Sequence, residues 1–174
     1  MSEWLPVIII GFAIALVLGP VMWLKPSQRD SRLADLRSRA ARGGITVQIQ
    51  ALPPVQGEGT AAVYYYRWGD RKRLQIGWTL QRQRVVHELN FAGSWDWSNG
   101  RAAPKPAWKY LLQLLDAIPS GCCAIIATDI GLGLQWSENG GDKAFEQLSA
   151  TLAEYTPLIE EAIRKVSPIK LPED

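Results

Sequence analysis

The first pattern along the chain is an apolar run without charge. Residues 5–24 contain no charged side chain, and Trp4 and Trp23 stand near the two ends of the run. At ~1.5 Å per residue, a helix from Trp4 to Trp23 is roughly 28 Å long, close to the ~30 Å hydrocarbon core of a bilayer. The basic start and the small-residue cleavage site of a signal peptide are missing. The pattern therefore predicts a permanent transmembrane anchor within residues 1–25.

Basic residues follow this run and none precedes it. Six lysines and arginines lie between Lys25 and Arg42. Under the positive-inside rule, this asymmetry predicts a bacterial inner-membrane protein whose N-terminus lies outside and whose C-terminal domain is cytoplasmic. The side chains expected at the membrane interface are Trp4, Trp23, Lys25, Arg29 and Arg32.

Within the run, three small residues recur four positions apart. They are Gly11, Ala15 and Gly19. Small residues at this spacing allow the backbone of another helix to approach closely. They are candidates for a helix-packing face, although such spacing is also common by chance.

A second helical pattern covers residues 26–44. Ser27 and Asp30 form an S-x-x-D capping signal, and apolar residues recur at helical spacing until Gly43-Gly44. The segment predicts a short basic juxtamembrane helix. Two roles are open for its charges: setting the topology alone, or binding lipid or a partner.

From residue 45 the period changes from helical to alternating. Alternation over residues 45–51, 61–68 and 74–81 predicts three strands, and the second and third are expected to form a hairpin across Gly69-Asp70. A further short strand is expected over residues 85–89. The turn before it contains neither Gly nor Asn.

The second half of the chain repeats the scheme with helices added. Apolar spacing predicts a helix over residues 108–118, a strand hairpin over 122–136, and a helical stripe over 145–166 in which Pro157 either kinks one helix or begins a second. Strands in adjacent pairs with two helices indicate an α+β domain over residues 45–174. The expected sheet is largely antiparallel and covered by helices on one face.

Candidate catalytic chemistry is sparse. The two cysteines, Cys122 and Cys123, are adjacent, so we expect both to be reduced and to begin a buried strand. The single histidine, His87, stands beside Glu88, but neighbouring strand residues point to opposite faces, so a structural histidine is favoured. The sequence predicts no enzyme, no metal site and no cofactor.

Two segments are candidate partner-binding sites. Trp95 and Trp97 lie in a polar, glycine-containing stretch over residues 90–105, where they either cap the core or form an exposed patch. The turn Arg71-Lys72-Arg73 follows three tyrosines and a tryptophan, a combination that can bind nucleic acid. The net charge of only +2 and the lack of a nucleic-acid-binding signature argue against that partner.

Residues 5–47 resemble a known family. The apolar run, the segment Leu24-Lys25-Pro26-Ser27-Gln28-Arg29, the charged helix and the step Gly43-Gly44-Ile45-Thr46-Val47 are similar to the YajC-type accessory subunit of the bacterial preprotein translocase. The resemblance covers about a quarter of the chain. It lacks the Gly-Asp-x-Val type of turn before the double glycine, and the C-terminal domain is much larger than in that family. It implies association with the SecD and SecF components, without catalysis.

Together these patterns predict a single-pass inner-membrane accessory or scaffold protein that binds a protein complex in the same membrane. The alternative is a membrane-tethered domain that senses a ligand or lipid through Trp95 and Trp97.

Overall fold

The computed structural model describes residues 4–23 and 27–165, in two compact units whose boundary lies between Asp35 and Leu36. The first unit contains helix α1 (Leu5–Trp23) and the first half of helix α2 (Gln28–Arg42). The capping signal is confirmed: the Asp30 amide donates to Ser27 Oγ, which in turn donates to the Asp30 carboxylate. These bonds lower the pKa of Asp30. The second half of α2 belongs to the unit that holds the sheet.

The predicted transmembrane anchor is wrong. Across residues 4–23 and 27–165, no helix is both long and apolar enough to cross a membrane. Helix α1 ends after 19 residues, and a span needs about 20 predominantly apolar ones. The single-pass class, the inner-membrane location and the cytoplasmic placement of the C-terminal domain were all inferred from that span, so these predictions are corrected with it.

The second unit is built on one six-stranded sheet in which every pair of neighbouring strands is antiparallel. The strand order is β1-β2-β6-β5-β3-β4. The strands are β1 (Ile45–Ala51), β2 (Thr60–Arg67), β3 (Trp78–Arg82), β4 (Trp95–Trp97), β5 (Cys122–Ala127) and β6 (Gly131–Trp136). The α+β class with an antiparallel sheet is therefore what the structure shows, with β1 and β4 at its two edges.

The hairpin predicted across Gly69-Asp70 does not form. Instead β2 pairs with β1 and β6, while β3 pairs with β5 and β4. The β5–β6 hairpin, which the sequence does predict, lies between β2 and β3. The Trp68 indole donates to the Thr128 carbonyl, so the chain leaving β2 is bonded to the turn of the inserted hairpin.

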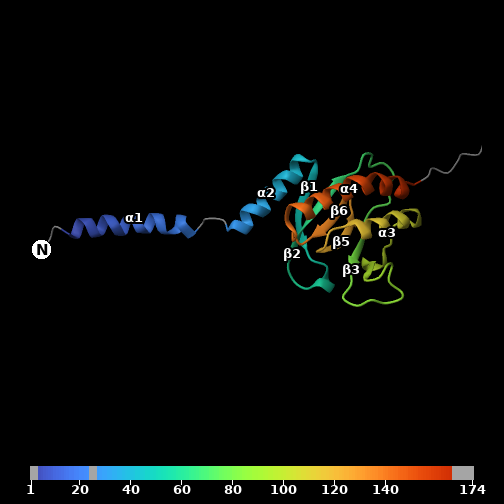
Figure 1. The fold of residues 1–174 in the computed structure, drawn as a ribbon, viewed down its shortest axis with the longest axis horizontal. Helices are drawn as coiled ribbons and strands as arrows, with labels where there is room; N and C mark the ends of the chain where they lie inside the picture. Colours follow the sequence, from blue (N-terminus) through green and yellow to red (C-terminus); the bar gives the residue numbers. More distant parts are fainter. Residues whose placement is uncertain (1–3, 24–26, 166–174) are drawn as a thin grey trace, which may run out of the picture. The chain divides into compact units, whose positions relative to one another are not determined.

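Two helices cover one face of the sheet (Figure 1). They are α3 (Trp108–Ala117) and α4 (Gly141–Ile163), and α4 continues as a single helix through Pro157. Alternate strand residues point toward them: Tyr64 of β2 and Trp136 of β6 are buried, and the Tyr64 ring lies 5.8 Å from that of Trp136 and 6.1 Å from that of Phe145 in α4. Cys122 and Cys123 are free and buried, as expected.

The opposite face of the sheet depends on a glycine in β6. A Cβ at Gly133 would lie 2.5 Å from the Tyr65 ring and 2.8 Å from Val63 Cγ1. The missing side chain therefore leaves room for the buried Tyr65 ring. The hairpin predicted over residues 122–136 includes this glycine, but alternation does not show which ring its missing side chain accommodates.

The strand expected over residues 85–89 is also wrong, because these residues form a loop after β3. The polar stretch that follows is ordered, with β4 and two short 3-10 helices, η2 (Ser98–Gly100) and η3 (Lys105–Ala107). Alternation alone did not distinguish an exposed apolar loop from a short strand.

Candidate functional site

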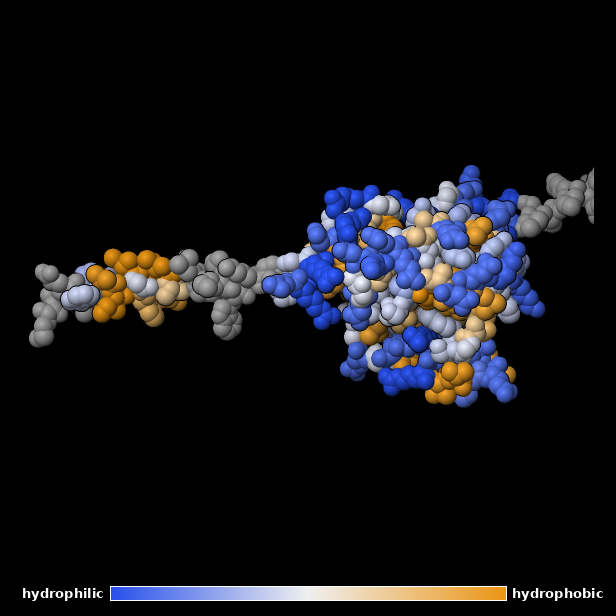
Figure 2. All heavy atoms as spheres, viewed as in Figure 1, coloured by the Kyte–Doolittle hydropathy of each residue, from blue (hydrophilic) through white to orange (hydrophobic). Residues whose placement is uncertain are grey.

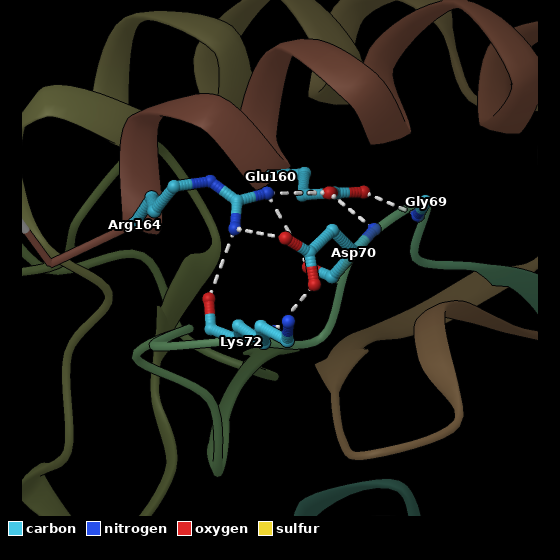
Figure 3. Close-up of polar contacts among 5 residues, drawn as sticks. All are labelled: Gly69, Asp70, Lys72, Glu160 and Arg164. Carbon is cyan, nitrogen blue, oxygen red and sulfur yellow. Dashed lines mark hydrogen bonds and ion pairs between the residues drawn. The ribbon is translucent and has the colours of Figure 1, made fainter.

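The predicted basic turn is held by α4. Glu160 accepts hydrogen bonds from the backbone amides of Gly69, at 2.6 Å, and Asp70, at 2.9 Å. Arg164, one turn further along α4, donates to Glu160 at 2.7 Å and to the Lys72 carbonyl at 2.9 Å (Figure 3). A carboxylate that accepts backbone amides and a guanidinium is strongly bonded. We call this network the Glu160 clamp.

The Glu160 clamp leaves the basic side chains outside it. Arg71, Lys72 and Arg73 are exposed, while the clamp uses the Lys72 carbonyl and not its ammonium group. The amides of residues 69 and 70 resemble an anion-binding turn, but the chain's own Glu160 occupies it. The turn is therefore a fixed part of the fold with cationic side chains in solvent.

Trp95 and Trp97 lie on strand β4 and are half-buried. The Trp97 ring packs in an aromatic cluster with three others, at centroid distances of 5.9 Å to Trp78, 4.9 Å to Phe91 and 6.4 Å to Trp108. Trp95 makes no such ring contact in the part of the chain that the structure describes. Of the two readings offered by the sequence, capping of the core fits Trp97, and neither tryptophan is a freely exposed anchor.

The most exposed apolar side chains of the sheet domain lie in residues 82–91, from the last residue of β3 into the loop that follows it, and we call this segment the tip loop. Val85 is 58% exposed, Val86 67% and Leu89 96%. Figure 2 shows apolar atoms bordered by hydrophilic ones at this end of the domain, where the loop projects in Figure 1. Exposed apolar side chains that gather in one segment mark a contact surface more often than a scattered few do.

An open cavity of about 420 Å³ adjoins the tip loop. Residues from three segments line it: Pro54 and Val55 after β1, the tip loop itself, and Asp96 of β4. The Gln56 amide donates to the Arg82 carbonyl at 2.6 Å and so connects the first two segments. One side of the cavity is therefore held in place by this bond, and the exposed tip loop forms another side.

Charged and ionisable groups in this cavity have no partner of their own. The side chains of Arg84, His87 and Asp96 all line it, and none makes a hydrogen bond or ion pair with the other residues that the structure describes. His87, interpreted from the sequence as structural, is in fact exposed. These groups remain available to a bound molecule.

A second carboxylate clamp lies at the other end of α4. Glu138 receives two hydrogen bonds from Arg37, from Nε at 2.8 Å and Nη2 at 2.6 Å, and one from the Tyr64 hydroxyl at 2.8 Å. Burial and the bond to Glu138 raise the pKa of Tyr64. Glu138 has φ of +58°, which is uncommon for a residue with a side chain. We call this network the Glu138 clamp; it attaches the end of α2 to the sheet.

The cysteines are unsuited to thiolate chemistry. Burial raises the pKa of Cys123 to about 11 and that of Cys122 to about 12. Reactive cysteines carry lowered pKa values in electropositive, accessible surroundings. Within residues 4–23 and 27–165, no group of three or more His, Cys, Asp or Glu side chains is placed to hold a metal ion.

The predicted site residues are not brought together. Trp95 and Trp97 are on the β4 edge, whereas Arg71, Lys72 and Arg73 lie in the clamped turn between β2 and β3. In the first unit Trp4, Gly11, Ala15, Arg29 and Arg32 are exposed. Trp23 and Gly19 lie in α1, and Lys25 lies outside the described residues. Because their expected roles require a membrane span, the structure gives those roles no support.

The tip loop was missed by the sequence analysis. Its signal was present: two valines stand between Arg84 and His87, with Leu89 close behind and no turn residue before them. Alternation was read there as a strand, although a strand needs a neighbour with which to pair. No family model, curated protein or solved structure matches this chain. The YajC-like resemblance of residues 5–47 therefore stays a prediction.

Proposed function

We propose that this chain is a non-catalytic adaptor that binds a protein partner through the tip loop. The observation that carries the proposal is the exposure of Val85, Val86 and Leu89 beside a polar cavity. Burying an exposed side chain of this size contributes about 1.5–3 kcal/mol, so a partner that covers all three gains considerable binding energy. In the isolated chain, the exposure of these three side chains forgoes that free energy of burial, and a bound partner would recover it.

The charge of the loop defines the partner's chemistry. Arg82 and Arg84 are exposed, and Glu88 is the single acidic side chain among residues 82–91. A partner segment with an apolar side chain flanked by carboxylates would complement this surface. Arg84 also lines the cavity, where it could pair with such a carboxylate.

The test compares variants of the full-length chain in binding to a partner recovered from cells. Val86→Asp with Leu89→Asp should weaken binding at least tenfold, since each replaces an apolar contact by a charge of the partner's own sign. Leu158→Asp is the matched control, because Leu158 is also an exposed leucine, at 39%, but lies on α4. Equal affinity for all three proteins would overturn the proposal.

A second candidate is ligand sensing in the same cavity, and the position of Asp96 favours it. This residue lines the cavity together with Arg84, so a bound ligand would meet a carboxylate and a guanidinium there. A fragment screen by NMR provides the test. Fragments that shift His87 in the wild type, and lose affinity in Asp96→Asn or Arg84→Ala, would support sensing; a screen without such fragments would remove it.

A further inference from the structure

Edge strand β1 has an open row of backbone groups. The Leu52 amide bonds to the Gly59 carbonyl at 3.0 Å, next to the last pair of the β1–β2 ladder, Ala51 with Thr60. Because antiparallel pairs alternate, the even-numbered residues of β1 bond to β2. The N–H and C=O groups of Ile45, Val47 and Ile49 therefore point outward from the sheet, whereas the Ala51 carbonyl accepts a bond from the Gln135 side chain at 2.9 Å.

Nothing in β1 protects this edge. The sequence Ile-Thr-Val-Gln-Ile-Gln-Ala contains no charged residue and no proline, and the β1–β2 register runs without a bulge. Natural edge strands usually carry such features because an open edge pairs with other strands. With seven residues, β1 offers an edge about 24 Å long.

A groove of about 650 Å³ runs beside the strand. Apolar residues line it, among them Val47, Ile49 and Ala41 of α2, together with the charged residues Arg37 and Arg67. Ile49 is 52% exposed, so its side chain is free to meet a neighbour. The groove gives a further strand space for its side chains as well as open backbone groups.

We propose that a second copy of this chain fills the groove, with the two β1 strands paired antiparallel about a two-fold axis at Gln48. This inference uses none of the residues of the tip loop. This register pairs apolar residues with apolar ones and polar residues with polar ones: Val47 faces Ile49 of the second copy, and Thr46 faces its Gln50. Gln48 faces Gln48, with an amide on each side able to donate and accept.

Charges near the ends of the strand favour the same orientation. Arg42 and Arg67 lie at the Ile45 end, and Glu58 lies in the turn beyond Ala51. Arg67 and Glu58 are exposed and have no ion-pair partner in the described chain. The two-fold axis places the basic end of one strand beside the acidic end of the other. A parallel pair would bring like charges together.

The test introduces a charge at residue 48, which lies on the two-fold axis and therefore faces residue 48 of the second copy. Gln48 is exposed on the face opposite the helices and accepts one side-chain bond among the described residues, from the Gln50 amide at 3.1 Å, so we expect its replacement to change the monomer little. Gln48→Lys alone, or Gln48→Glu alone, sets two like charges opposite each other and should raise the dimer dissociation constant at least tenfold. Mixing the two variants in equal amounts should restore the dimer as a Lys–Glu pair.

Sedimentation of the full-length chain over a concentration series up to about 1 mM provides the measurement. A single pairing edge predicts a weak, concentration-dependent dimer. Val47→Pro should also abolish it while keeping the β1–β2 ladder, because it removes an outward N–H. Circular dichroism checks that this variant is folded, and Val86→Asp, in the tip loop, should dimerise like the wild type.

Three outcomes would overturn the proposal. The wild type could remain monomeric throughout the series, which would mean that a second copy of this chain does not pair with β1. Either Gln48 variant could dimerise as strongly as the wild type, which would place the contact elsewhere. The mixed variants could stay monomeric, which would exclude the two-fold register.

Discussion

The two edges of the sheet are both exposed, but their backbone groups are satisfied differently. At one edge, β4 has only three residues, and the outward N–H and C=O groups of Trp95 both bond to Ala92, at 2.8 and 3.1 Å. At the other edge, the described chain places no backbone partner on the outward groups of Ile45, Val47 and Ile49 in β1, and the Ala51 carbonyl accepts a side-chain bond from Gln135. A short edge strand bonded to its own loop has few unpaired backbone groups, whereas a long uncharged edge strand presents a row of unpaired N–H and C=O groups with which another strand can pair.

This difference assigns different kinds of recognition to the two edges. The β4 edge offers side chains, the apolar and basic tip loop, so it suits a partner selected by its own side chains. The β1 edge offers main-chain groups and a groove lined partly by apolar residues, so it suits another strand.

The β4 edge should be disrupted by loss of its aromatic cluster. Trp97→Ala removes a ring that contacts three other aromatic side chains. We expect it to lower the free energy of unfolding by about 2–4 kcal/mol, measured by urea denaturation. Trp95→Ala is the control on the same strand, and its cost should be smaller because Trp95 lacks ring contacts among the described residues. An equal cost for both would mean that the cluster does not hold this edge.

The β1 edge should respond to loss of the Glu138 clamp. Glu138→Ala leaves Arg37 and the buried Tyr64 hydroxyl without their acceptor, which should cost about 1–3 kcal/mol of unfolding free energy. Glu138→Gly removes the same bonds but relieves the positive φ, so it should cost less than the alanine variant. Thermal unfolding of both variants gives the comparison; an alanine variant as stable as the wild type would show that the clamp contributes nothing.

Alkaline pH should act on the β1 side of the sheet. Burial raises the pKa of Tyr64 and of Tyr65 above the value of about 10 for an unfolded tyrosine. The unfolded chain therefore releases these protons first, so stability is retained below about pH 10 and falls as the pH rises above it. Urea denaturation at pH 8 to about 11 measures the slope. Tyr64→Phe should flatten it, and an unchanged slope would assign the effect to other groups.

The smallest effect is expected at the centre of the sheet, between the two edges. Cys122 and Cys123 are buried with raised pKa values, so a thiol reagent at pH 8 should modify them far more slowly than in urea. Trp97→Ala should speed their modification more than Glu138→Ala, because β5 is bonded to β3 beside the β4 edge. Similar rates in both variants would mean that the sheet opens as one unit.

Local patterns predicted much of the secondary structure. The cap at Ser27 and Asp30, the hairpin of β5 and β6, and the helices after residues 104 and 140 were all recoverable from spacing. The pairing of β2 with β6 was not, because it joins strands about 70 residues apart. The apparent span at residues 5–24 failed differently, because freedom from charge is not the same as sufficient apolar length.

The candidate sites were harder to predict than the fold. The Arg71-Lys72-Arg73 turn was recognised as basic, but the Glu160 clamp that fixes it connects residues 90 positions apart. His87 was interpreted as a structural histidine on a short strand over residues 85–89, and the structure places it exposed in a loop. A sequence pattern reports the residues that one element buries, whereas a site depends on which elements meet.

Short-range patterns specify the local features: where helices begin, where strands alternate, and the lack of charge along residues 45–51. Each depends on neighbours within a few positions, so the chain needs no other contact to specify it. Tertiary structure decided which strands became edges, and with them which uncharged strand was left unpaired. That choice rests on distant hydrogen bonds, because the β5–β6 hairpin enters between β2 and β3 and moves β1 and β4 to opposite sides of the sheet.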